Sequence, residues 1–101
     1  MNYLEEIAFR IRERLDPETL PEGDIDALFR LYAVLALAVG AEVNAANVHD
    51  AWVAWMAGQE PSHPSLIPFE ALDARTADSD KPFVDAIRSV ARTLELRHGA
   101  T

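Results

Sequence analysis

The residues with the clearest chemical potential are two tryptophans three positions apart, Trp52 and Trp55. An exposed indole stacks on a nucleobase for about 1–3 kcal/mol, so this pattern is compatible with a ring-binding site at Trp55. The same spacing also fits two anchors of a hydrophobic core or an interface, because residues three apart lie on neighbouring positions of a helix surface. Both interpretations follow from the residue types, and the spacing does not decide between them.

Three polar residues further along the chain are candidates for ligand contacts. Asp80 can accept a hydrogen bond from an amino group or a hydroxyl, or it can cap the helix that follows it. Lys81 can meet a phosphate near that helix start, or it is an ordinary surface charge. His63, which precedes a proline, can contact a ligand or can hold its own loop by a hydrogen bond to the backbone.

Standard catalytic and metal-binding patterns are missing from the sequence. It contains no Gly-x-Ser-x-Gly elbow, His-Glu-x-x-His motif, glycine-rich phosphate loop or dinucleotide fingerprint. It has no cysteine, which excludes thiolate chemistry and disulfides, and the spacing of His49, Asp50 and His63 matches no usual ligand set. We therefore expect a protein that is not an enzyme, with no catalytic residue, no bound metal and no cofactor.

Length and charge narrow the class of partner. The chain has 101 residues, which predicts a single domain over 1–101, and its formal charge is −8. This charge argues against nucleic acid and against an anionic membrane as partners. The longest apolar run, 31–41, is shorter than the roughly 18 residues of a membrane span, and the first residues do not resemble a secretory signal. The prediction is a cytoplasmic protein.

Apolar residues recur at helical spacing in four segments, and no segment alternates as a strand does. The four predicted helices cover 2–15, 25–39, 44–57 and 82–94. The second is apolar on most sides and is predicted to be the central, buried helix. Between the last two helices lies 59–80, which is rich in proline and yet apolar, so we expect it to pack across the helices. The predicted class is all-α: a four-helix single domain with a long ordered Pro-rich crossover loop.

Capping residues support these boundaries. Asn2, Asp24 and Asn44 stand where helix N-caps are expected, since their side chains accept hydrogen bonds from the free N–H groups of the first turn. Gly40 and Gly58 stand where the second and third helices are expected to end.

Four short strings in the second half of the chain resemble the ryanodine-receptor (RyR) repeat family. They are HDAW (49–52), WMAG (55–58), HPSLIPFEAL (63–72) and DKPFV (80–84), within a similarity that covers about 44–95. The resemblance implies a small helical, non-catalytic module, found in tandem in calcium-release channels and singly in bacterial and phage proteins, where it is suspected of sensing nucleotides or related metabolites. It also implies that Trp55 faces a ligand and that Asp80 is the polar residue ahead of the last helix.

The resulting hypothesis is a non-enzymatic, RyR-like module that binds a nucleotide-like small metabolite. Its groove is expected between the third helix, the Pro-rich loop and the start of the fourth helix, with Trp55, His63, Asp80 and Lys81 as ligand contacts. The alternative is a protein-interaction or homodimerisation module without a small-molecule ligand. In that case an apolar face carrying Trp52 and Tyr32 would meet a second copy or a larger protein partner.

Overall fold

The computed structural model of the chain describes residues 2–99, with side chains described through residue 95. Five α-helices and three short 3-10 turns follow one another, and no strand occurs within the described range, so the predicted all-α class is confirmed. The helices are α1 (Tyr3–Glu13), α2 (Ile25–Ala38), α3 (Ala45–Gln59), α4 (Ala74–Asp78) and α5 (Lys81–Gly99). The 3-10 turns are η1 (Pro17–Thr19), η2 (Gly40–Glu42) and η3 (Phe69–Ala71).

The predicted caps at the first three helix starts are confirmed. The side chains of Asn2 and Asp24 each accept a hydrogen bond from the backbone N–H three residues later. Asn44 forms a reciprocal capping box, in which it accepts from the N–H of Asn47 at 2.9 Å while the Asn47 side chain accepts from the N–H of Asn44 at 2.9 Å. Polar side chains close to each helix therefore satisfy the N–H groups that the helix itself leaves free.

The two predicted glycine stops have different outcomes. Gly40 adopts a φ of +77° directly after α2, as a left-handed helix terminator requires. Gly58 does not end α3: the helix continues through Gln59, and Glu60 is its C-cap. Pro61 is the physical reason, because a proline disfavours the helical conformation of the residue before it, whereas a glycine inside a helix only weakens it.

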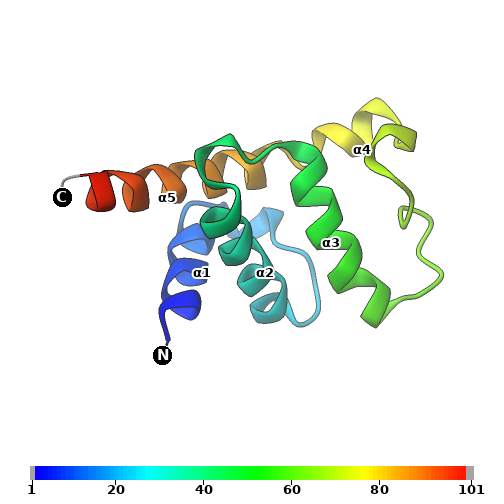
Figure 1. The fold of residues 1–101 in the computed structure, drawn as a ribbon. Helices are drawn as coiled ribbons and strands as arrows, with labels where there is room; N and C mark the ends of the chain where they lie inside the picture. The colour runs from blue at the N-terminus through cyan, green and yellow to red at the C-terminus, as the bar shows by residue number, and fades with distance from the viewer. Residues whose placement is uncertain (1, 100–101) are drawn as a thin grey trace.

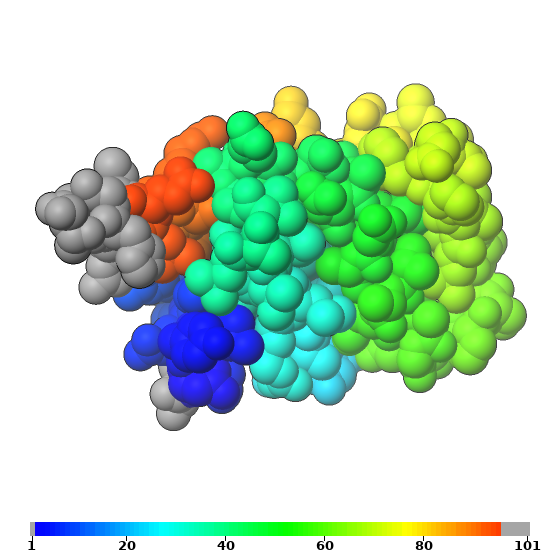
Figure 2. Space-filling model, viewed as in Figure 1, coloured from blue at the N-terminus to red at the C-terminus, as the bar shows by residue number. Residues whose placement is uncertain are grey.

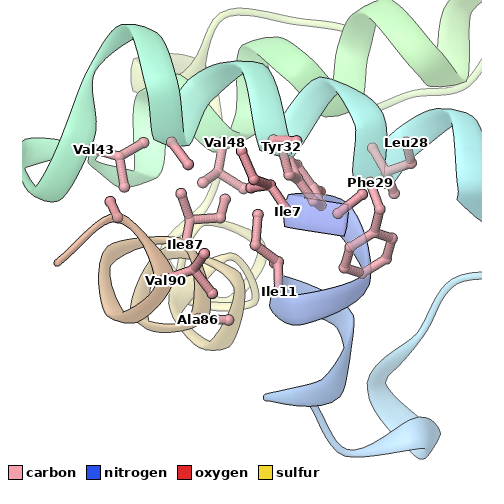
Figure 3. Close-up of a cluster of buried hydrophobic side chains, with 14 of the residues drawn as sticks. Ile7, Ile11, Leu28, Phe29, Tyr32, Val43, Val48, Ala86, Ile87 and Val90 are labelled. Atoms are coloured by element: carbon pink, nitrogen blue, oxygen red, sulfur yellow. The ribbon is translucent and has the colours of Figure 1, made fainter. Parts of the chain in front are cut away.

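Helix α2 is the centre of the core, as predicted. It contacts α1, α3 and α5, and Figure 1 shows α3 lying between α2 and the Pro-rich segment. In Figure 3, Ile11 of α1 and Ile87 and Val90 of α5 point into the same apolar cluster beneath α2, and all three are fully buried. The outer side of α2 is open to solvent, because Val34 and Leu37 are about half exposed. Burial of these apolar stripes is the main stabilising contribution, at roughly 25 cal/mol per Å².

The Pro-rich segment 60–80 is an ordered part of the fold. It contains η3 and α4, and η3 contacts α3. Figure 2 shows this segment, in yellow and yellow-green, packed against the green atoms of α3 at one end of the molecule. The expectation that the apolar crossover packs on the helices is therefore confirmed for its contact with α3.

In the part of the chain that the structure describes, no helix combines the length and the apolar composition that a bilayer span needs.

Candidate functional site

His49 lies on α3 and is only 3% exposed. Its Nε2 is 2.6 Å from the carbonyl oxygen of Ile67, in the Pro-rich segment. A carbonyl oxygen only accepts hydrogen bonds, so Nε2 carries the proton and donates it, which leaves Nδ1 of the neutral ring as an acceptor. His49 thus ties the loop to α3.

Trp52 stands one helical turn after His49 and is packed between two imidazoles. The His49 ring lies nearly parallel to the indole, with centroids 5.7 Å apart and planes at 21°. The His63 ring meets the indole edge-on, with centroids 5.0 Å apart and planes at 81°. The three rings form one continuous aromatic wall that joins α3 to the Pro-rich segment.

His63 has the loop-holding role that sequence reasoning offered as one alternative. Its Nδ1 accepts a hydrogen bond from the backbone N–H of Ser65 at 3.0 Å. Nδ1 is therefore unprotonated, and the neutral ring carries its proton on Nε2, where it can act as a donor. A loop role and a ligand contact are compatible, because the two ring nitrogens point in different directions.

Asp80 immediately precedes α5 and is half-buried. Its backbone carbonyl accepts from the N–H groups of Phe83 and Val84, but its carboxylate accepts no hydrogen bond from any described residue. The alternative role as a side-chain cap is therefore not realised here, in contrast to Asp24. Burial raises the pKa of the Asp80 carboxyl, and the nearby His49 acts in the opposite direction.

Tyr32 comes from the central helix α2 and is 1% exposed. Burial, and secondly the negative charge of Asp80, raise the pKa of its hydroxyl, which therefore stays protonated at neutral pH. The hydroxyl has no hydrogen bond to a described residue, and no fully buried side-chain N or O atom in that part of the chain lacks a partner. The hydroxyl oxygen of Tyr32 is therefore not fully buried, and it borders a cavity that Tyr32 lines.

This cavity, which we call the aromatic hollow, has a volume of about 330 Å³ and opens where η1, α3, the Pro-rich segment and the start of α5 meet. It is lined by Thr19, Pro21, Tyr32, His49, Trp52, His63, Ser65, Thr76, Ser79, Asp80 and Phe83. Flat rings form its walls, and one carboxylate, two imidazoles and several hydroxyls supply polar atoms. Such a combination suits a small molecule that has a ring and a polar edge.

Of the four predicted ligand contacts, the aromatic hollow brings together His63 and Asp80. Trp55 does not line it: the indole is 7% exposed, and its Nε1–H donates to the carbonyl oxygen of Asp24 at 2.8 Å. The expected groove around Trp55 is therefore wrong. A helix turns by about 300° over three residues, so Trp52 and Trp55 point some 60° apart, and here that angle separates the hollow from the core.

Lys81 also lies outside the aromatic hollow. It is exposed and lines a separate depression together with Asp78, Asp85 and Arg88. One step along a helix rotates the side chain by about 100°, which directs Lys81 away from the hollow that its neighbour Asp80 lines. The predicted pairing of Lys81 with Asp80 at one ligand is therefore wrong.

The two predicted interface residues turn out to be lining residues. Tyr32 is buried and Trp52 is half-buried, and both face the aromatic hollow. An outward-facing contact patch built on Tyr32 is therefore wrong, because its side chain is almost fully buried and its ring packs against those of Phe29 and Phe83.

Sequence reasoning did not include His49 or Phe83 among the residues of the site, although both line the aromatic hollow. His49 had a usable signal, because it stands three residues before Trp52 and so shares its side of the helix. The hydroxyls of Thr76 and Ser79 had no such signal, and they line the cavity from α4 and from the residue that follows it.

Residues 2–92 match one family model, which is described as a domain of unknown function (DUF7701). No curated protein and no solved structure matches the chain. The match corrects the resemblance to the ryanodine-receptor repeat: the family found is a different one, and nothing shows a relationship to that repeat. The four short strings were too few and too local to establish it.

Proposed function

The chain belongs to the DUF7701 family, and we propose that it is a non-enzymatic module that binds a small, nucleobase-bearing metabolite in the aromatic hollow. One observation carries the proposal. A wall of three rings, His49, Trp52 and His63, faces the same cavity as the Asp80 carboxylate and the unpartnered hydroxyl of Tyr32.

The walls support a flat ring as the ligand. Trp52 and Phe83 line the hollow from α3 and α5, and Tyr32 lines it from α2. Aromatic surfaces on several sides favour a planar group, because each such contact buries a large apolar area with few rotatable bonds. The volume of about 330 Å³ stands at the small end of the ~300–1,000 Å³ common for ligand pockets, which suits a base or a nucleoside.

The polar atoms support recognition of the edge of that ring. Asp80 accepts from an amino group, and the Nε2–H of His63 and the Tyr32 hydroxyl can donate to a ring nitrogen or a carbonyl. No lysine or arginine is among the described residues that line the hollow, so the site offers a base better contacts than it offers a phosphate. The proposed ligand is therefore the nucleoside portion, with no phosphate contact to Lys81.

Binding is proposed in preference to catalysis because of how the two histidines are held. His49 has one ring nitrogen bonded to the Ile67 carbonyl, and His63 has one bonded to the Ser65 N–H. Each imidazole therefore has one ring nitrogen committed to holding the Pro-rich segment in place. Rings fixed in this way suit hydrogen-bonding groups of a binding site.

The test is a calorimetric titration of the purified full chain with the four common ribonucleosides up to millimolar concentration, with tryptophan fluorescence recorded in parallel. At least one nucleoside is expected to bind, and Trp52→Leu is expected to weaken that binding by about tenfold or more. Lys81→Gln is the matched control and is expected to bind like the native protein. Absence of binding by all four nucleosides, or a loss in the control as large as that in Trp52→Leu, refutes the proposal.

Self-association is the second candidate, and exposed apolar side chains favour it. Phe9 on α1 is 55% exposed, and Val34 and Leu37 on α2 are 46% and 48% exposed. Side chains of this kind contribute to isologous dimer contacts when they form one patch. Analytical ultracentrifugation over a hundredfold range of concentration tests the idea: a mass that stays at one chain argues against it, and a dimer that Phe9→Asp dissociates supports it.

A further inference from the structure

Asp80 gives the aromatic hollow a negative charge that is opposed there by no Lys or Arg side chain of the described residues, and His49 is the nearby group that favours the carboxylate. Within residues 2–95 the one ion pair joins Arg12 to Asp26, far along the chain from Asp80. Lys81 and Arg88 line a separate depression, and Nε of Arg88 donates to a backbone carbonyl at 2.6 Å. Among the described residues, no Lys or Arg side chain lines the hollow that the carboxylate faces.

The negative charge of Asp80 affects the hydroxyl of Tyr32, which also lines the aromatic hollow. Asp80 is half-buried, and its carboxylate contributes to the raised pKa of the Tyr32 hydroxyl on the opposite element. A partly desolvated carboxylate without a hydrogen bond is unfavourable for the empty protein. A bound cation would remove that cost.

The walls suit a cation as well as a ring. Trp52, Phe83 and Tyr32 present aromatic side chains to the hollow, and the centroids of the Tyr32 and Phe83 rings are 5.8 Å apart. The negative face of such a ring attracts an ammonium or amidinium group. His49 adds a second acceptor, because its Nε2 is committed to Ile67 and its Nδ1 has no described partner.

We propose that the aromatic hollow selects an organic cation, in which an ammonium or amidinium group on a flat body pairs with Asp80 while the aromatic walls cover the body. This inference rests on the proposed function, since it names the charge of the ligand that the same site would hold. It follows from the placement of the Asp80 carboxylate before α5 and of the aromatic rings on α2 and α3. It also follows from the described lining, which contains no Lys or Arg side chain.

The test compares two near-isosteric probes that differ in charge. Benzamidine carries an amidinium on a flat ring, and benzamide carries a neutral amide in its place. Calorimetric titration of the native full chain with each probe is expected to give at least about tenfold tighter binding of benzamidine. This comparison needs no variant, so it is decisive even if a substitution impairs folding.

Two charge-matched variants locate the effect. Asp80→Asn is expected to abolish the preference for benzamidine. Asp78→Asn removes the same charge two residues away, on the side of the separate depression, and is expected to keep the preference. Circular dichroism confirms that each variant is folded before titration.

The outcomes separate this inference from the proposed function. Equal affinity for the two probes overturns the inference, and so does an equal loss in the two variants, since that result means a general attraction to an acidic protein. If nucleosides bind without any preference for benzamidine, only the cation inference fails. If neither nucleosides nor benzamidine bind, both proposals fail.

Discussion

Replacement of Trp55 by phenylalanine should destabilise the protein much more than the same replacement at Trp52. The two residues share a helix and a residue type, but Trp55 is 7% exposed and its Nε1–H is bonded to the Asp24 carbonyl at the start of α2. Trp52 is half-buried and lines the aromatic hollow. The pair therefore tests whether the structure assigns packing to one tryptophan and ligand contact to the other.

The size of the effect follows from two losses at Trp55. The lost hydrogen bond costs about 1 kcal/mol net. The smaller ring leaves a void on the order of 40 Å³, which costs about 1 kcal/mol at ~24 cal/mol per Å³. The free energy of unfolding should fall by about 2 kcal/mol, which lowers the melting temperature by about 8–16 °C in a domain of this size. Trp52→Phe should cost less than about 1 kcal/mol, because no hydrogen bond is lost and the site borders open space.

Urea denaturation followed by circular dichroism measures both free energies of unfolding without relying on the fluorescence of the residue that is removed. Nucleoside titration of the same proteins supplies the functional half of the comparison. Trp55→Phe should retain native affinity while folded, and Trp52→Phe should lose affinity while remaining stable. If Trp52→Phe is the more destabilised variant, the assignment of the two tryptophans is refuted.

The remaining predictions concern charge, backbone conformation and capping. Burial raises the pKa of Asp80 in the folded protein, so the ionised carboxylate lowers the stability of the fold above that pKa. Asp80→Asn should therefore stabilise the protein at pH 7. The gain should disappear as the pH falls through that pKa and the native carboxyl becomes neutral, and thermal melts at several pH values measure it. Gly40→Ala should cost about 1–2 kcal/mol because φ is +77°, whereas Gly58→Ala, inside α3 with open space around it, should gain about 0.5–1 kcal/mol; equal melting temperatures would contradict this. Asn44→Ala should cost about 1 kcal/mol in urea denaturation because it removes the capping box with Asn47, and a neutral result would argue against that box.

Much of the fold was predictable because its causes are local. The cap residues Asn2, Asp24 and Asn44 satisfy N–H groups within one helical turn, and the periodic apolar residues of α1 and α5 lie on one side of each helix whatever the neighbours are. The stop at Gly40 was predictable for the same reason, since it depends on one residue's backbone conformation. Gly58 was misjudged because a glycine is only permissive, and the proline two residues after Gln59 decided the boundary.

The candidate site was predictable only in its residue types. Of the four residues predicted as ligand contacts, His63 and Asp80 line the aromatic hollow, whereas Trp55 and Lys81 lie outside it. A rotation of 60–100° about a helix axis separates Trp52 from Trp55 and Asp80 from Lys81. Sequence spacing fixes the angle between two side chains of the same helix. It does not fix which side of α3 or α5 faces the rest of the molecule, because that depends on long-range packing.

The sequence by itself determined an acidic, all-helical chain with a Pro-rich crossover, because composition, helix periodicity and capping act within a few residues. Only the tertiary structure decided that Tyr32 from α2, His49 and Trp52 from α3, His63 from the crossover and Asp80 before α5 surround one hollow. These residues are up to 48 positions apart, from residue 32 to residue 80, and only His49 and Trp52 are related by a local interaction, on α3. Their meeting depends on how the apolar faces of three helices are buried together, which is a property of the whole core.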